Sequence, residues 1–189
     1  MEISYDWQDG PEILHSNVSC VDALHEASLL DPIFKPPQDT GAATNQDGHI
    51  IKSNKGVHIN EIYSPLYAKC SPTAQIMEDF IFSAKEVNFT PNSAFQYLYP
   101  MFGYDILFSA YKNGDYYKPH RDASKLTVIL WLSGKTFAGG DLYFPDFNYT
   151  ITYEPNKIFL FPSYYWHEVT PLSTEEEGFV RYCASAFIN

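Results

Sequence analysis

The second half of the chain alternates short apolar runs with turn-forming residues. The runs are four to ten residues long, and Gly, Pro, Asn and Asp separate them. Runs of this length with such boundaries are typical of β-strands, and many of them in succession indicate a sandwich or barrel. The pattern predicts strands over 105–112, 116–122, 126–133, 141–144, 148–153, 157–161, 165–171 and 179–188.

The first half of the chain carries the signals of two helices. Ser19 and Asp22 have the spacing of a capping box, which predicts a helix over 23–30. Ser71 followed by Pro72 predicts the start of a second helix, because serine caps helices and proline fits the first helical position. An apolar stripe at helical spacing indicates that this second helix packs against the sheet, and the stripe consists of Ile76, Met77, Phe80, Ile81 and Ala84.

Between these helices the pattern is less regular. Alternating residues predict short strands over 3–7 and 56–63, and Pro91 lies in a turn-rich segment that ends near Pro100. Residues 31–56 show neither strand nor helix periodicity. A connection of this length is either a mobile surface loop or a lid over a site, and the sequence leaves both possibilities open.

These elements predict a mainly β protein with flanking helices. A chain of 189 residues is most simply one domain, so we expect a single domain over 1–189. Within it, residues 1–104 would form the supporting helices, strands and long loop. Residues 105–188 would form the β core.

Composition and charge narrow the class of protein. Hydrophobic residues make up 45% of the chain and aromatic residues 17%, which is typical of a folded globule and not of a disordered tail. The formal charge is 12 − 23 = −11, which disfavours general attraction to nucleic acids or to anionic membranes.

The three cysteines Cys20, Cys70 and Cys183 lack metal-ligand spacing and favour reduced thiols. No apolar run has the form of a signal peptide or the length of a membrane span. These features predict a soluble, cytoplasmic protein.

The motif with the most chemical content is His120-Arg-Asp122. In an extended strand, residues two apart point to the same side, so this imidazole and carboxylate would share one face. His167, 45 residues after Asp122, would complete a 2-His-1-carboxylate triad with open metal positions. Such ligands suit Fe(II), Mn(II) or Zn(II), and the alternative is that these histidines are structural or surface residues.

Arg181 interrupts the apolar run 179–188. A buried guanidinium requires an anionic partner. If 165–171 and 179–188 form a hairpin, Arg181 lies opposite Val169, two residues or about 6.6 Å from His167. That separation suits a five-carbon dicarboxylate held between metal and guanidinium, and an ion pair with Glu168 is the alternative.

The order of these motifs resembles the iron(II)- and 2-oxoglutarate-dependent oxygenases, and within them the prolyl 4-hydroxylase-like branch. The resemblance covers about residues 105–188 and includes the segment from Tyr111 to Asp122 and the Gly139-Gly-Asp-Leu142 motif. It implies a double-stranded β-helix, or jelly roll, packed against the N-terminal helices. It also implies roles for named residues: Fe(II) on His120, Asp122 and His167, and the distal carboxylate of 2-oxoglutarate on Arg181, with assistance from Tyr111.

The resemblance further implies a reaction. Fe(II), 2-oxoglutarate and O2 would hydroxylate an unactivated C–H bond with release of succinate and CO2, with ascorbate as a supporting reductant. The first choice of substrate is a prolyl residue in a protein or peptide, with Trp131 and Trp166 lining its pocket unless they are ordinary packing aromatics. A free amino acid or secondary metabolite is the alternative substrate. The alternative that is not an enzyme is a jelly roll that binds a metal or a sugar without catalysis.

Overall fold

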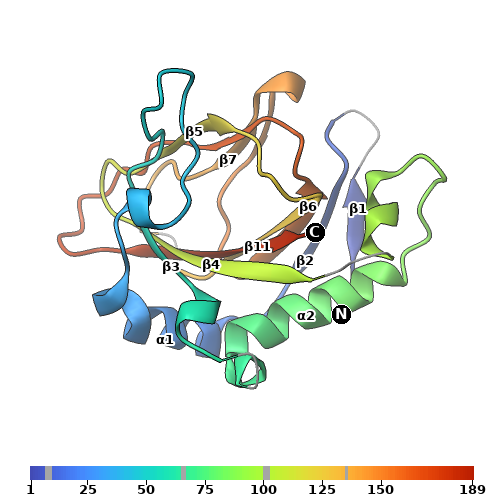
Figure 1. The fold of residues 1–189 in the computed structure, drawn as a ribbon, viewed down its shortest axis with the longest axis horizontal. Helices are drawn as coiled ribbons and strands as arrows, with labels where there is room; N and C mark the ends of the chain where they lie inside the picture. The colour runs from blue at the N-terminus through green and yellow to red at the C-terminus, as the bar shows by residue number, and fades with distance from the viewer. Residues whose placement is uncertain (7–9, 65–66, 100–102, 135) are drawn as a thin grey trace.

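The computed structural model describes residues 1–6, 10–64, 67–99, 103–134 and 136–189. Two antiparallel sheets face each other, and two helices cover the outer face of the larger sheet (Figure 1). The prediction of a mainly β jelly roll with flanking helices is confirmed. None of the described helices has the length and apolar character that crossing a membrane requires.

The larger sheet has seven strands in the order β1-β2-β9-β6-β11-β4-β3. Its central strands β6 and β11 are almost wholly apolar on the side that faces the helices, and the smaller sheet covers their other side. Burial of both faces stabilises the larger sheet. The strands are β1 (Ser4–Asp6), β2 (Ile13–Asn17), β3 (Lys55–His58), β4 (Tyr104–Tyr111), β6 (Leu126–Trp131), β9 (Lys157–Pro162) and β11 (Arg181–Ile188).

The smaller sheet has four strands in the order β5-β10-β7-β8 and lies opposite the larger one (Figure 1). Its strands are short, and β10 pairs with both β5 and β7. They are β5 (Tyr117–His120), β7 (Leu142–Phe144), β8 (Tyr149–Ile151) and β10 (His167–Val169).

The helix α2 (Pro72–Lys85) begins and packs as its sequence predicts. The Ser71 side chain accepts a hydrogen bond from the Ala74 N–H at 3.1 Å, and Pro72 occupies the first turn. Met77, Phe80, Ile81 and Ala84 are buried against the sheet. Only Ile76 of the predicted stripe is half-buried.

The helix α1 (Val21–Leu30) is anchored by a buried carboxylate. Glu26 accepts hydrogen bonds from Tyr63 Oη at 2.7 Å, Ser71 Oγ at 3.0 Å and the Thr73 N–H at 3.1 Å. A carboxylate with three donors is well compensated for burial, and here it ties α1 to the start of α2. The predicted capping box is wrong, because α1 begins after Cys20 and no side chain caps it.

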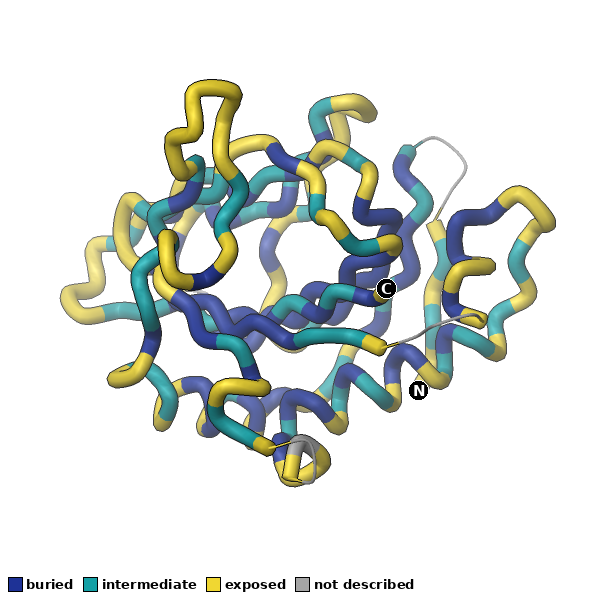
Figure 2. The backbone as a smooth tube through the Cα atoms, viewed as in Figure 1, coloured by how far each residue is buried: buried dark blue, intermediate teal, exposed yellow. Residues whose placement is uncertain are grey.

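The buried apolar side chains form two cores. Figure 2 shows that buried residues are concentrated in the central strands of the larger sheet and on parts of the helices. One core lies between the helices and the larger sheet, and includes Phe80, Phe95 and Phe108. The other lies between the two sheets, and includes Phe144 and Phe161. The second core leaves room at one end of the barrel for the polar residues described below.

The predicted hairpin between 165–171 and 179–188 is wrong. β10 belongs to the smaller sheet, whereas β11 pairs with β4 and β6 in the larger sheet. Arg181 is therefore opposite Tyr111 and not Val169. The hairpin was predicted because a polar connection joins the two consecutive strands. In the structure the chain crosses from the smaller sheet to the larger one, and both strands then bury their apolar side chains.

Other boundaries also differ from the sequence pattern. β2 was not predicted, because its run of apolar residues is only two long before polar residues resume. The predicted strand 56–63 ends early, and Ile59–Glu61 forms a 3-10 turn. β1 confirms the first strand in part, with Trp7 outside the described residues.

The remaining short elements are 3-10 turns. Two of them, with isolated strand bridges, order the long 31–56 stretch. The turns are Asp31–Ile33, Pro37–Asp39, Ile59–Glu61, Ala68–Cys70, Ala94–Leu98 and Pro145–Phe147.

Candidate metal centre

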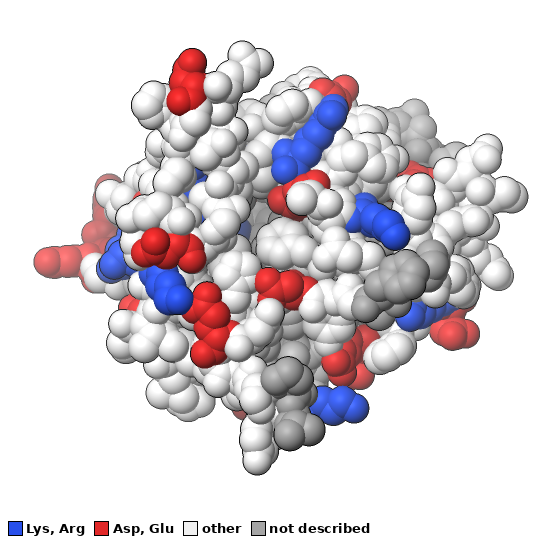
Figure 3. Space-filling model, viewed as in Figure 1, with Lys and Arg blue, Asp and Glu red and all other residues white. Residues whose placement is uncertain are grey.

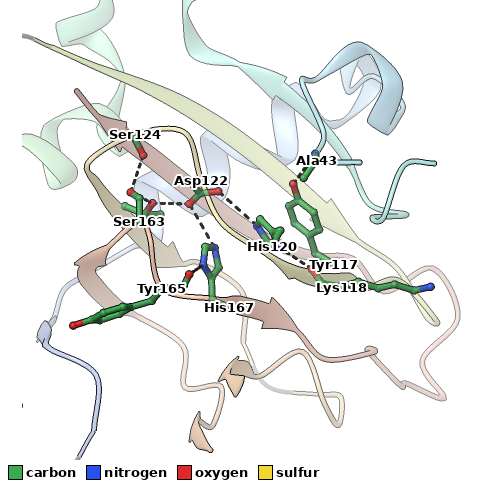
Figure 4. Close-up of polar contacts among 10 residues, drawn as sticks. Ala43, Tyr117, Lys118, His120, Asp122, Ser124, Ser163, Tyr165 and His167 are labelled. Atoms are coloured by element: carbon green, nitrogen blue, oxygen red, sulfur yellow. Dashed lines mark hydrogen bonds and ion pairs between the residues drawn. The ribbon is translucent and has the colours of Figure 1, made fainter. Parts of the chain in front are cut away.

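Three side chains from separate parts of the chain converge between the two sheets. His120 ends β5, Asp122 follows two residues later, and His167 begins β10 opposite His120. Asp122 Oδ1 lies 3.6 Å from His120 Nε2, and Asp122 Oδ2 lies 3.4 Å from His167 Nε2. Figure 4 shows the three side chains pointing toward one another.

Backbone carbonyls fix the orientation of both imidazoles. His120 Nδ1–H donates to the Lys118 carbonyl at 2.8 Å, and His167 Nδ1–H donates to the Tyr165 carbonyl at 3.0 Å (Figure 4). Each ring therefore keeps its Nε2 lone pair free to face the partner ring and the carboxylate. This is the arrangement that metal-ligating histidines adopt, because the carbonyl selects the tautomer and raises the basicity of the free nitrogen.

A chain of hydroxyls holds the Asp122 carboxylate. Thr127 Oγ1 donates to Asp122 Oδ2 at 2.6 Å and lies 2.7 Å from Ser163 Oγ. Ser163 in turn lies 2.8 Å from Ser124 Oγ, and its carbonyl accepts from the Asp122 N–H at 3.1 Å. The carboxylate is thus fixed from β6 and from the end of β9.

The protonation states suit metal binding. Burial, aided by the neighbouring His167, lowers the pKa of His120 to about 3, although Asp122 opposes the shift. Burial alone would raise the pKa of Asp122, but the two histidines and Thr127 hold it below its ordinary value. A neutral imidazole and an ionised carboxylate are the forms that coordinate metals.

The spacing of the ligand atoms also fits a metal. All three lie within 4.8 Å of one another. An ion with bonds of about 2.1 Å needs neighbouring ligand atoms about 3 Å apart, so small side-chain movements would close the site around an ion. Two imidazoles and one carboxylate on one side of the ion leave the other positions open.

Arg181 lines the same cavity and is 1% exposed. Its guanidinium carbon is 4.9 Å from the Tyr111 ring centre, 4.8 Å from that of Tyr153 and 5.9 Å from that of Trp131. Among the described residues no carboxylate pairs with it, and its Nε and Nη1 lack hydrogen-bond partners. A buried guanidinium with free donors fits a carboxylate that comes from a ligand.

The structure therefore brings together the five predicted site residues. His120, Asp122, His167, Tyr111 and Arg181 all line one inner cavity of about 40 Å³. Tyr111 reaches Arg181 because β4 and β11 are paired in register. The alternative partner Glu168 does not pair with Arg181.

The two tryptophans that were predicted to line the substrate pocket lie in different places. Trp131 is 1% exposed and packs between Tyr153 and Phe159 beside Arg181, far from the outer surface. Trp166 is 38% exposed and carries Arg121 over its ring at 4.8 Å. Only Trp166 lines a groove at the mouth of the site.

Tyr117 and Lys52 also line the inner cavity, and neither was among the predicted site residues. Tyr117 stacks on His120 with ring centres 3.5 Å apart, and its hydroxyl accepts from the Ala43 N–H at 3.0 Å (Figure 4). Lys52 bridges to Tyr117 from the long 31–56 stretch. Burial lowers the pKa of Lys52 to about 8, with Cys183 and Asp122 opposing the shift. The irregular stretch offered no periodicity from which its position could be predicted.

Comparisons with known proteins match the part of the chain that holds the site. A family model described as the 2OG-Fe(II) oxygenase superfamily matches residues 106–189, the part of the chain that holds the converging residues. The matched part, which is less than half of the chain, is similar to that superfamily. No curated protein matches the sequence. The superfamily implies Fe(II), 2-oxoglutarate and O2 as cofactor and co-substrates, and so a dioxygenase.

Solved oxygenase structures share the fold at low identity. A prolyl-4-hydroxylase from Pseudomonas putida superposes with a TM-score of 0.62 and 16% identity, covering 94% of this chain and 91% of that one. A viral collagen prolyl hydroxylase from Paramecium bursaria Chlorella virus-1, solved with 2OG, gives 0.55 and 14%, covering 92% and 94%. A 2OG-Fe(II) oxygenase family protein from Burkholderia pseudomallei gives 0.52 and 14%, covering 94% and 84%. At these identities the likeness concerns the fold.

Proposed function

We propose that this oxygenase hydroxylates an unactivated C–H bond, with a prolyl residue of a protein or peptide as the substrate. The observation that carries the proposal is the single cavity shared by the His120–Asp122–His167 cluster and the unpaired Arg181 guanidinium. A metal site and a dicarboxylate anchor in one enclosed space are what this reaction requires. A purely structural role leaves the free guanidinium donors unexplained.

The chain's own residues would take the following roles. His120, Asp122 and His167 would hold Fe(II), and Arg181 would bind the distal carboxylate of 2-oxoglutarate. Tyr111, buried against the guanidinium, would close the carboxylate site to water; burial raises its pKa far above the ordinary value, so it stays a neutral donor.

With these groups bound, iron, 2-oxoglutarate and O2 supply the oxidising chemistry, giving succinate, CO2 and one oxygen atom inserted into the substrate. The protein supplies position and shielding. The carbonyl-fixed imidazoles and the Thr127-bound carboxylate keep the ligand set rigid, and the aromatic rings around Arg181 exclude water from its donors. The chemistry requires no general base from the protein.

Two observations support a peptide substrate. The fold is similar to that of a prolyl-4-hydroxylase and a collagen prolyl hydroxylase. A groove of about 530 Å³ runs past His120 between the 43–51 segment and Trp166, and an exposed tryptophan at a groove suits apolar proline rings.

A small-molecule substrate is the second candidate, and one observation favours it. The 31–56 stretch lies over the site, since Ala43 contacts Tyr117 and Lys52 bridges to the same residue. A segment in this position would enclose a pocket of the size that a free amino acid or metabolite requires.

The test is succinate release with Fe(II), ascorbate and 2-oxoglutarate, measured against proline-containing peptides and free amino acids. Turnover of internal prolines identifies the peptide substrate, and turnover of free amino acids alone identifies the second candidate. Absence of succinate with every substrate, together with no thermal shift on adding Mn(II) and 2-oxoglutarate, would indicate a non-catalytic jelly roll.

Two variants test the assigned roles. His167→Ala should abolish metal binding and turnover, whereas His25→Ala on the exposed face of α1 should change neither. Arg181→Ala should raise the KM for 2-oxoglutarate by about tenfold to a hundredfold while metal binding persists, since a charged hydrogen-bonded contact is lost. An unchanged KM would remove Arg181 from its role.

A further inference from the structure

Lys52 is a buried cation that the proposed reaction does not use. It is 5% exposed, and its Nζ lies 5.4 Å from the Tyr117 ring centre. Among the described residues, no carboxylate lies within ion-pair distance of its ammonium and no group hydrogen-bonds to it. A desolvated ammonium without an anion is costly, which indicates that a ligand supplies one.

The position of Lys52 differs from that of Arg181. Arg181 lines the inner cavity and does not line the outer pocket that is described next. Lys52 lines both that cavity and an outer pocket of about 440 Å³, together with Tyr117 and Asp122. Its side chain thus lies at the boundary between the space for the co-substrate and the space open to a substrate.

The charges in the site leave one positive charge unmatched. The charged side chains of the inner cavity, apart from the histidines, are Lys52, Asp122 and Arg181. If a divalent metal and the dianion of 2-oxoglutarate were bound, their charges would cancel. Asp122 would then offset one of the two positive charges of Lys52 and Arg181, which leaves a net charge of +1. Arg181 is then paired with the co-substrate, and Lys52 remains available to an additional anion.

The outer pocket is lined by charged side chains of both signs. Arg121 lines it and makes no ion pair with a described residue, and it rests on the Trp166 ring instead. The Asp105 carboxylate in this pocket is paired with His58 at 2.6 Å. The face in Figure 3 is hollowed near its centre, with acidic and basic side chains around the hollow. Lys52 and Arg121 are matched in number by Asp105 and Asp122 in this pocket, so the two cations without an ion-pair partner, and not the net charge of the pocket, favour an anionic group on the substrate.

We propose that Lys52 binds a carboxylate of the primary substrate. The substrate is then an α-carboxylate: a free amino acid, or the C-terminal residue of a peptide, hydroxylated beside its own carboxylate. This inference rests on the oxygenase chemistry of the proposed function and restricts its substrate to a residue with a free carboxylate, which is a C-terminal residue of a peptide or the free amino acid of the second candidate. It predicts that an internal prolyl residue, which carries no carboxylate at this position, is a poor substrate.

The experiment compares matched acids and amides. The probes are free L-amino acids including L-proline, N-acetylated peptides that end in proline, and the carboxamide of each. The first readout is substrate-dependent succinate release. The second is binding of each probe to Mn(II)- and 2-oxoglutarate-loaded protein by calorimetry, which needs no turnover.

The wild type should favour the acid over the amide by about tenfold to a hundredfold in kcat/KM and in Kd, the range of one hydrogen-bonded charge. Lys52→Met, which keeps the length and apolar packing, should lose this preference without changing 2-oxoglutarate binding. Lys52→Arg should retain part of it. Lys85→Met, which removes a lysine from the Phe82 ring on α2, is the matched control and should behave as wild type.

Three results would overturn the inference. These are an equal preference for acid and amide in the wild type, an unchanged preference in Lys52→Met, and tight binding of internal-proline peptides with none of the acids. Loss of 2-oxoglutarate binding in Lys52→Met would instead assign the lysine to the co-substrate. Failure of the proposed function is distinguishable, because it would abolish 2-oxoglutarate decarboxylation in wild type and variants alike.

Discussion

Asp122 depends on neighbours that the metal motif itself does not contain. Thr127 on β6 donates to its Oδ2, and Ser163 after β9 binds both Thr127 and the Asp122 backbone. A carboxylate that is held in one rotamer presents its oxygen to a metal without a further loss of freedom. Such partners commonly affect metal affinity nearly as strongly as the ligands do.

Thr127→Val should therefore weaken metal binding. The substitution keeps the shape of a 1% exposed side chain and removes its hydroxyl. We expect the Kd for Mn(II) to rise by about tenfold, measured by calorimetric titration. Thr127→Ser, which restores the hydroxyl, should recover most of the affinity. Equal affinities in Thr127→Val and wild type would show that Asp122 needs no such support.

At the scale of elements, the segments on either side of the site are joined by close backbone contacts. The Ala138 N–H and the Ser173 N–H each donate to the other residue's carbonyl at 2.8 Å, and the Gly140 N–H donates to the Thr170 carbonyl at 3.2 Å. Gly139 has a φ of +70°, and a Cβ placed there would lie 2.0 Å from the Pro171 carbonyl oxygen. The link between β7 and the end of β10 thus requires glycine.

Gly139→Ala should be strongly destabilising. Gly41→Ala is the matched control, because Gly41 has a φ of +64° but open space around its Cβ position. Both variants carry the strain of a positive φ, about 1 kcal/mol, so the clash alone separates them. We expect Gly139→Ala to lose at least about 2 kcal/mol more free energy of unfolding than Gly41→Ala, measured in urea. Similar losses would mean that the Pro171 carbonyl moves aside freely.

The pairing of β3 with the start of β4 includes a titratable contact. His58 Nδ1 lies 2.6 Å from Asp105 Oδ2. This hydrogen bond raises the pKa of His58 above its ordinary value. Burial opposes this increase, and a hydrogen bond to the Thr40 carbonyl contributes to it. A histidine with a raised folded-state pKa stabilises the fold below its unfolded pKa of about 6.5, and that stabilisation is lost as pH rises through the folded value.

His58→Gln should thus cost more stability in acid than in base. The difference in free energy of unfolding between wild type and variant should be largest near pH 5.5 and should shrink toward pH 9, as the wild-type imidazole deprotonates. Urea titrations across that range measure it. In an Asp105→Asn background the pH dependence should flatten, and a dependence of the opposite sign would contradict the assignment.

At the scale of the whole molecule, the helices support the sheet from the side opposite the site. Phe80 on α2 is 0% exposed in the core beneath the larger sheet, whereas Phe82 on the same helix is 57% exposed. Figure 1 shows α1 and α2 together under the larger sheet, whose strands β4 and β11 carry Tyr111 and Arg181. The site geometry therefore depends on a core that contains none of its residues.

Phe80→Ala should destabilise the whole fold by about 3–5 kcal/mol, because a buried aromatic ring is removed from a close-packed core. Phe82→Ala, the same change on the solvent face, should stay within about 0.5 kcal/mol of wild type. Thermal unfolding followed by circular dichroism compares them. Equal melting temperatures in the two variants would show that α2 does not stabilise the sheet.

The sequence by itself determined the local elements and the residue types of the site. Ser71-Pro72 and the apolar stripe define α2, and the alternating runs define most strands, because short-range sterics and periodicity act within a few residues. The His-x-Asp spacing indicated an imidazole and a carboxylate on one side of the chain, although β5 ends at His120 and Asp122 follows it.

Only the tertiary structure decided which distant strands meet. It placed β10 and β11 in different sheets, set Arg181 opposite Tyr111, and brought Lys52 from an aperiodic stretch to the boundary of the cavity. These pairings depend on how both sheets bury their apolar faces at once, and that balance is a property of the whole chain.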